Sequence, residues 1–486
     1  MDTSDYNLRN RIGLFAGPAV FLIMLMMPVP EGLTEAAWMV AAVGIFMAIW
    51  WVSEAIPIPA TALLPIALFP ILEVGTVREA TTPFANPLIY LFMGGFIIAL
   101  AMERSNLHKR IALNVVKLVG VKPGSIVIGF MLSAAFLSMW VSNTATAMMM
   151  LPIALSIIKL VEHPDDISAG DLQTNFGLIM VLCIAYACNI GGIGTLIGTP
   201  PNALMAGYML ETYGVDIGFS QWMLIGVPLV VISLPIVYIL LVKIIYPIKL
   251  KEIPGGRELI NQQLKKAGSI SRAELMVAIV FTATALLWIV RPLLESYIPN
   301  ISDTGIAIFG AIVMFLLPVN FKKGEFVLKW EDAKRLPWEV LILFGGGLSL
   351  AAAITDTGLA EWIGASLSAL SGWPVIILIV TSLLVIIFLT EITSNTATAA
   401  AFLPILASVA IAMGQDPLIL VIPAAIGASC AFMLPVATPP NAIVYGSGLV
   451  SIPQMAKAGF VLNLVMVVLI TTVMYLLLGY VFSITL

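Results

Sequence analysis

Two short polar clusters, both reading Ser-Asn-Thr-Ala-Thr, interrupt long apolar stretches of this sequence. The first opens SNTATAMMMLPIALS at residues 142–156, and a near copy, SNTATAAAFLPILAS, follows at residues 394–408. Hydroxyl and amide side chains donate and accept hydrogen bonds, and their oxygens are ligands for hard cations. Such clusters in an apolar setting favour the binding of a small ionic solute together with cations.

Each cluster would do this best at the tip of a hairpin that enters the bilayer and returns on the same side. Carbonyls at the C-terminus of the incoming half-helix lack partners and suit a hard cation. Amides at the N-terminus of the outgoing half-helix carry positive partial charge and suit an anion. Because Ser, Asn and Thr are favoured N-caps, we expect the outgoing helices to begin at Ala145 and Ala397.

A second motif is also duplicated, as GTPPNAL at residues 198–204 and ATPPNAI at residues 437–443. Threonine caps helices, proline suits the first helical turn, and the residue before a proline is driven out of the helical conformation. Each copy therefore predicts a broken helix facing the hairpin tips. The glycine-rich stretch at residues 191–198 lacks the spacing and setting of a nucleotide loop, so we interpret it as the point where the first of these helices unwinds.

Composition defines the surroundings of these motifs. Of the 486 residues, 60% are hydrophobic and 10% charged, and the mean hydropathy is +1.06. A soluble protein needs more charge to cover its surface. Apolar runs of about 17–25 residues recur along the chain, long enough to cross about 30 Å of hydrocarbon as helices. The predicted fold class is an all-α polytopic membrane protein, since the alternation typical of a membrane β-barrel is absent.

The pattern predicts eleven spans and two re-entrant hairpins, the latter at residues 124–160 and 373–412. The spans are expected near residues 13–29, 37–53, 58–73, 87–105, 175–209, 222–246, 273–297, 303–319, 338–358, 418–446 and 459–482. This threading puts all but Arg78 and Arg291 of the 23 basic residues on one side. The positive-inside rule makes that side cytoplasmic. We therefore expect a cell (inner or plasma) membrane protein with its N-terminus inside and its C-terminus outside.

An internal duplication organises the chain. The two Ser-Asn-Thr clusters are 252 positions apart, an offset that also aligns Phe92 with Phe344, while the TPPN motifs are 239 apart because the first half has a longer loop at residues 163–173. One hairpin enters from each side, so the halves are predicted to be inverted copies, as in secondary transporters with a site near the midplane. The predicted parts are a tail and first helix (1–36), a first repeat (37–246), a basic cytoplasmic linker (247–272) and a second repeat (273–486).

Charge near the motifs points to ion coupling. No Lys or Arg stands in either hairpin core or beside either TPPN motif. A bound dianion would then rely on helix dipoles of about half a unit charge each, on neutral donors and on co-bound cations. Glu391, three residues before the second cluster where the first half has Met139, is a buried carboxylate and a functional candidate. We favour a role in bracing backbone amides over direct cation ligation. The alternative is that the polar clusters only hold neighbouring helices together through hydrogen bonds, and the duplication of both motifs argues against it.

With these paired motifs, nearly the whole chain resembles the divalent-anion:sodium symporters, also called INDY-like dicarboxylate and citrate transporters. The resemblance implies an elevator-type transporter, usually a homodimer, with scaffold and transport domains, that co-transports sodium ions with a C4-dicarboxylate. It implies a first sodium site at Ser138, Ser142, Asn143 and Gly198, and a second at Thr390, Thr393, Asn395 and Ala437. It further implies substrate contacts from Asn143, Thr144, Ser394, Asn395 and Thr396, with Thr199 and Thr438 beside them.

The leading hypothesis is therefore electrogenic, sodium-driven symport of succinate, malate or fumarate. A sodium-independent exchanger of dicarboxylates or citrate remains open, and sulfate is a third possibility because tetrahedral dianions also suit helix N-termini. The sequence shows no nucleophile–base pair, metal cluster or nucleotide loop, so we do not expect an enzyme or a nucleic-acid partner. The expected partners are the dicarboxylate, sodium, the lipid bilayer and a second copy of the chain. Three cysteines in apolar segments, Cys183, Cys188 and Cys430, predict no disulfide.

Overall fold

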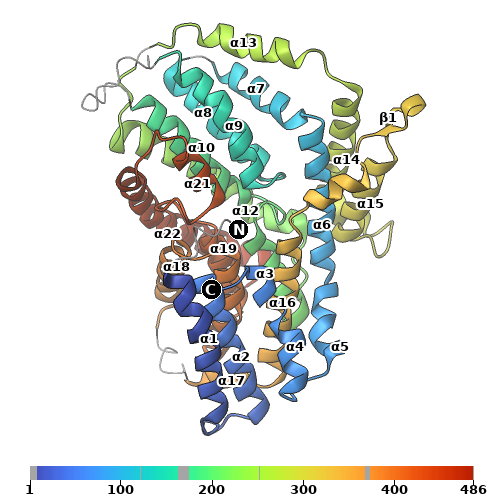
Figure 1. Ribbon diagram of the computed structural model, residues 1–486, viewed down its shortest axis with the longest axis vertical. Coiled ribbons are helices and arrows are strands. Elements are labelled where there is room, and N and C mark those ends of the chain that lie inside the picture. The colour runs from blue at the N-terminus through green and yellow to red at the C-terminus, as the bar shows by residue number, and fades with distance from the viewer. Residues whose placement is uncertain (1–7, 121, 162–174, 251, 367–372, 485–486) are drawn as a thin grey trace.

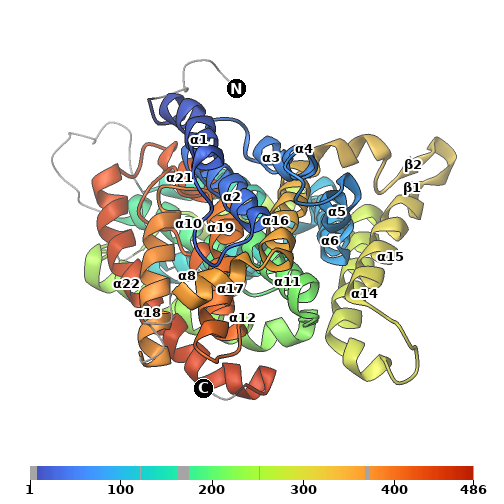
Figure 2. The same ribbon diagram turned by 90° about the horizontal axis from the view of Figure 1, so that it is seen from below.

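The computed structural model describes residues 8–120, 122–161, 175–250, 252–366 and 373–484, and within them the chain is almost wholly helical (Figures 1 and 2). The longer loop predicted at residues 163–173 lies outside the described residues. The first half contains α1 (Leu8–Met26), α2 (Glu35–Ser53), α3 (Ile58–Thr61), α4 (Leu64–Ile71), α5 (Val77–Thr81), η1 (Thr82–Ala85), α6 (Pro87–Arg104), α7 (Leu107–Val119), α8 (Pro123–Ser138), α9 (Asn143–Ile158), α10 (Phe176–Gly192), α11 (Pro200–Tyr213), α12 (Phe219–Ile239) and η3 (Leu240–Ile245).

The helix α13 (Gly256–Ala267) connects this half to the second. The second half contains α14 (Arg272–Leu294), α15 (Asp303–Leu316), β1 (Pro318–Asn320), η4 (Phe321–Lys323), β2 (Glu325–Phe326), η5 (Trp330–Arg335), α16 (Trp338–Asp356), α17 (Leu359–Ser366), α18 (Val375–Thr390), α19 (Asn395–Ala412), α20 (Leu418–Ala428), α21 (Pro439–Tyr445) and α22 (Ile452–Phe482).

Length and hydropathy confirm an all-α polytopic membrane protein. Eight helices in the described part of the chain are long and apolar enough to cross a bilayer: α1, α2, α6, α12 with η3, α14, α16, α19 and α22. Outward-facing side chains agree, since Ile279, Leu286 and Leu293, seven residues apart on one face of α14, are 60%, 54% and 73% exposed. Exposing this row of apolar side chains to water would be unfavourable, whereas contact with lipid is not. The three cysteines are free and buried.

The duplicated segments interlock. Helices α9 and α10 of the first half both pack against α21 of the second half, and α19 and α20 of the second half both pack against α11 of the first. These are the same two contacts at equivalent positions of the two copies. The helix α21 therefore packs against both α9 and α10, and α11 packs against both α19 and α20. This arrangement brings all the predicted breaks to one place.

Some parts of the fold differ from the sequence-based expectation. The apolar run predicted as a span at residues 303–319 stops at Leu316, and Pro318 begins a small antiparallel β-hairpin, because proline cannot donate the next helical hydrogen bond. Figure 2 shows this hairpin projecting at the edge of the molecule beyond α15. The segment predicted as a basic linker contains the helix α13, whose Arg257, Lys265 and Lys266 side chains are exposed.

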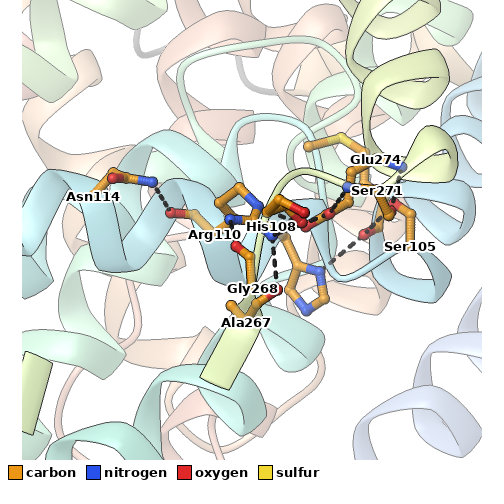
Figure 3. Close-up of polar contacts among 10 residues, drawn as sticks. Ser105, His108, Arg110, Asn114, Ala267, Gly268, Ser271 and Glu274 are labelled. Atoms are coloured by element: carbon orange, nitrogen blue, oxygen red, sulfur yellow. Dashed lines mark hydrogen bonds and ion pairs between the residues drawn. The ribbon is translucent and has the colours of Figure 1, made fainter. Parts of the chain in front are cut away.

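An arginine on α7 ties three elements together at the end of α13 (Figure 3). Arg110 donates to the carbonyl oxygens of Ala267 and Gly268 at 3.0 and 2.9 Å, and its Nε lies 2.7 Å from a carboxylate oxygen of Glu274. Glu274 also accepts the backbone N–H of Ser271 at 2.6 Å, in a capping box that starts α14. One guanidinium therefore satisfies the C-terminal carbonyls of α13 and fixes where α14 begins.

Candidate functional site

The first polar cluster joins α8 to α9 as a non-helical tip. Ser138 is the last residue of α8, Ser142 is the N-cap of α9, and its hydroxyl accepts the Ala145 N–H at 3.2 Å. The outgoing helix thus starts at Asn143, two residues before the predicted position, because the serine cap organises the turn that follows it. The tip exposes the first amides of α9, where the helix dipole is positive.

The second cluster forms an equivalent tip between α18 and α19. The incoming helix ends at Thr390, and the outgoing one starts at Asn395, again two residues earlier than expected. Thr393 lies between them, with its hydroxyl 2.9 Å from the Leu389 carbonyl and 2.6 Å from the Thr398 hydroxyl. Two hydroxyl hydrogens serve these three oxygens, so the Thr393 side chain is satisfied within the hairpin.

The TPPN motifs start α11 and α21, as the proline pattern predicts. Thr438 caps its helix by accepting the Asn441 N–H at 3.4 Å, whereas the Thr199 hydroxyl lies 3.2 Å from that of Ser429 in the other half. Only the second threonine therefore makes the expected side-chain cap.

The asparagines of these motifs brace the breaks in both halves. Asn202 donates to the carbonyls of Gly192 and Thr195 at 3.3 and 2.9 Å. Asn441 donates to Ala431 and Leu434, both at 3.1 Å, which are the same positions 239 residues later. Each amide holds two carbonyls of the chain that precedes it, so the non-helical turn is fixed by its own motif.

One cavity of about 580 Å³ lies where the four breaks meet. Its lining includes, from the predicted site, Ser142, Asn143, Thr144, Gly198, Thr199, Ser394, Asn395, Thr396, Ala437 and Thr438. The remaining predicted residues, Ser138, Thr390 and Thr393, are buried outside the lining. The size is typical of a small-molecule site, and the positive ends of α9 and α19 both contribute to its wall.

Behind the first tip, two buried oxygens have no hydrogen-bond partner. These are Ser138 Oγ and Asn143 Oδ1. The Cys188 thiol lies beside Ser138, but a thiol is a weak donor. A Cβ added to Gly192 would lie about 3 Å from both Asn143 Oδ1 and the Gly198 carbonyl oxygen, so glycine keeps this space open. Since buried oxygens are normally paired, a set left unpaired around a space fits a small hard cation.

A second group of oxygens converges behind the other tip. Thr390 Oγ1 lies 2.6 Å from Asn395 Oδ1 and 2.9 Å from the carbonyl oxygen of Ala428, the last residue of α20. The three oxygens share one hydrogen, which the hydroxyl can give to only one of the others. This surplus of acceptors again fits a cation, and all the ligands would be neutral. Among the described residues no group of three or more His, Cys, Asp and Glu gathers to hold a metal.

Several residues at the site were missed by sequence reasoning. Asn189 donates to the Thr438 hydroxyl at 3.1 Å and to the Ala431 carbonyl at 3.2 Å, linking the halves. Arg335 and Glu103 also line the cavity and lie 3.7 Å apart. Arg9 on α1 donates to the Ile392 carbonyl of the second tip at 2.8 Å. Basic residues therefore do approach the site, but from elements distant in sequence, where no local motif marks them.

Two broken helices and two hairpin tips around one cavity, in a bundle of apolar helices, define a membrane protein with the architecture of a secondary transporter. The fold is shared with solved transporters. The YdaH transporter of Alcanivorax borkumensis aligns over 92% of this chain and 99% of its own, with a TM-score of 0.60 and 13% identity. MtrF of Neisseria gonorrhoeae aligns over 93% and 96%, with a TM-score of 0.60 and 14% identity.

Residues 8–484 match the family described as the sodium:sulfate symporter transmembrane region, and the chain belongs to this family. It is 44% identical to the sodium-dependent dicarboxylate transporter SdcS of Staphylococcus saprophyticus, over 98% of this chain and 93% of the relative. It is 45% identical to the protein of the same name from Staphylococcus aureus strain USA300, over 96% of this chain and 90% of the relative.

Proposed function

We propose that this protein is a secondary active transporter that couples sodium to the movement of a C4-dicarboxylate such as succinate, malate or fumarate. One observation carries the proposal: both Ser-Asn-Thr tips, 252 residues apart in sequence, line a single cavity with surplus oxygens buried behind each. The names of the SdcS relatives support the substrate and the ion. Its role is transport, not catalysis.

In this proposal the dianion bridges the two tips. One carboxylate meets Asn143 and Thr144 at the start of α9, and the other meets Ser394, Asn395 and Thr396 at the start of α19. Thr199 and Thr438 lie in the wall between the tips. Amides, hydroxyls and two positive helix ends stabilise the negative charge between the tips. Sodium bound behind each tip supplies the remaining positive charge and orders the tip for the substrate.

The first sodium site comprises Ser138, Ser142, Asn143 and the Gly198 carbonyl. The second comprises Thr390, Thr393, Asn395 and the Ala437 carbonyl, with the Ala428 carbonyl, 2.9 Å from Thr390 Oγ1, as a further ligand. The Thr393 hydroxyl already has partners within the hairpin. Because Asn143 and Asn395 belong to both the cation and the substrate sets, ion and substrate stabilise each other's binding. Such reciprocal coupling is what symport requires.

Alternating access would follow an elevator motion. We propose that α8–α12 and α18–α22 move as a transport domain against a scaffold of α1–α6 and α14–α16. The N-terminus is cytoplasmic, the repeats 37–246 and 273–486 are inverted copies, and the protein is a homodimer in the cell membrane. In the same proposal the cavity opens to the cytoplasm beside Arg335 and Glu103, which makes this an inward-open state.

Reconstituted vesicles test the proposal. An inward sodium gradient should drive accumulation of labelled succinate, and replacing sodium by choline should abolish it. The alternative, a sodium-independent exchanger of dicarboxylate, citrate or sulfate, predicts uptake that ignores sodium and needs an unlabelled anion inside. Asn143→Ala and Asn395→Ala should each lower uptake with normal expression; wild-type rates in both would refute the site assignment.

A further inference from the structure

A single carboxylate is buried at the second tip and has no counterpart at the first. Glu391 directly follows Thr390 and is 3% exposed. Its oxygens accept the backbone N–H groups of Phe432, Met433 and Leu434 at 2.7, 2.9 and 3.2 Å. The Asn463 side-chain amide on α22 donates a further bond at 2.7 Å. The donors come from two parts of the second half, the segment between α20 and α21 and the helix α22.

The contacts fit the ionised form of Glu391. All four groups that its oxygens contact are N–H donors. A neutral carboxylic acid would present a hydrogen to one of these donors, whereas a carboxylate accepts from all of them. Glu391 therefore places a full negative charge within hydrogen-bond distance of the non-helical segment between α20 and α21.

The rest of that segment is also held. The Phe432 carbonyl accepts the Tyr186 hydroxyl at 2.8 Å, and the Ala431 carbonyl accepts from the Asn189 and Asn441 amides at 3.2 and 3.1 Å. The amides of Phe432, Met433 and Leu434 are thus directed to Glu391, and the carbonyls of Ala431 and Phe432 to side chains. The segment leads directly to Ala437 and Thr438 in the cavity wall, so its position sets theirs.

In the first half the equivalent amides are paired with backbone carbonyls instead of a carboxylate. Met139 stands where Glu391 does, and the amides equivalent to those of Phe432 and Met433 bond to the helix before them: Ile193 N–H to Ile190 at 3.1 Å and Gly194 N–H to Gly191 at 2.9 Å. As a result α10 runs to Gly192, whereas α20 stops at Ala428, three positions short of the equivalent Ala431. Glu391 captures the amides that would have continued α20.

We propose that Glu391 is a positioning residue that makes the two cation sites unequal. It is not a ligand, because donors occupy its oxygens. It unwinds α20 so that the Ala428 carbonyl is free to accept from Thr390, and its charge belongs to the residue that directly follows Thr390. At the first set of oxygens the equivalent residue is the uncharged Met139. The second site is therefore the stronger one and fills at lower sodium. This inference rests on the proposed sodium-coupled transport.

Glu391→Gln tests it with nearly the same shape and no charge. In vesicles, we expect the sodium concentration for half-maximal succinate uptake to rise about tenfold, the size expected for losing a nearby charge in a site of intermediate dielectric. The succinate KM at saturating sodium should change by less than about twofold, since the substrate contacts remain. Glu391→Asp keeps the charge and should recover part of the sodium affinity.

A matched control is Glu274→Gln, which removes another buried charge, 5% exposed, at a residue outside the cavity lining. It should leave half-maximal sodium unchanged. If Glu391→Gln lowers the maximal rate but not sodium affinity, the residue is only structural and the inference fails. If the wild-type protein itself transports without sodium, the proposed function fails first, so the two failures are distinguishable.

Discussion

Ser138 and Asn143 bury oxygens that no donor in the described structure satisfies. An unsatisfied buried polar atom costs about 1–3 kcal/mol, so its retention needs a compensating partner. Sodium would be that partner in the proposed mechanism. The two halves differ in this respect, because Thr390 in the second half shares its hydrogen with neighbouring oxygens even without an ion. Whether a mutation at Ser138 raises or lowers thermal stability in the absence of sodium therefore distinguishes an ion ligand from a residue with a structural role.

We predict that Ser138→Ala leaves thermal stability in choline unchanged or slightly raised, since it removes an unpaired hydroxyl. The stabilisation by sodium should weaken, with about tenfold more sodium needed for the same rise in Tm, as expected for a loss of about 1.4 kcal/mol in binding. Melting curves across a sodium titration measure both quantities.

Ser133→Ala is the control on the same helix. Its hydroxyl is buried but donates to the Gly129 carbonyl at 2.7 Å, so it already has a partner. That variant should keep the full response to sodium. A Ser138→Ala protein with a wild-type sodium titration would remove Ser138 from the cation site.

At the scale of elements, local motifs marked the breaks correctly. Ser-Asn-Thr and Thr-Pro-Pro act through the next few residues, by capping and by proline geometry, so the starts of α11 and α21 followed from sequence and those of α9 and α19 to within two residues. The helices α7, α13 and α17 and the β1–β2 hairpin were not foreseen. The positions of α7 and α13 depend on residues distant in sequence, Arg110 and Glu274, which no local pattern encodes.

The junction of α7, α13 and α14 should be sensitive to Arg110→Ala. The Arg110 and Glu274 side chains are 15% and 6% exposed, so the mutation leaves a buried carboxylate without its partner, at a cost of about 3–5 kcal/mol. A lower Tm of the purified protein measures the effect.

Arg104→Ala gives the comparison. Its partner is Asp332, and these side chains are 34% and 21% exposed, so screening limits the loss to about 0–1 kcal/mol. Equal Tm losses in the two variants would mean that burial of the Arg110 pair does not determine its contribution.

At the scale of the whole molecule, interlocking halves bring two cation sets and one anion cavity together. Two sodium ions and one dicarboxylate dianion sum to zero charge. On this count we expect electroneutral uptake, so the electrogenic mode favoured by the sequence would require a further cation beyond the two sets described here. A membrane potential imposed with valinomycin should leave the initial rate of succinate uptake unchanged, and a clear stimulation by a negative interior would contradict the two-cation count.

The burial of Cys183, Cys188 and Cys430 has a practical consequence for following such motion. Maleimide dyes and nitroxide spin labels react with accessible thiolates, and all three native thiols are shielded from solvent. Single or paired cysteines introduced at surface positions could therefore be labelled in an otherwise unaltered protein. Fluorescence transfer or electron paramagnetic resonance between such pairs would then report inter-residue distances during turnover without background from the native residues.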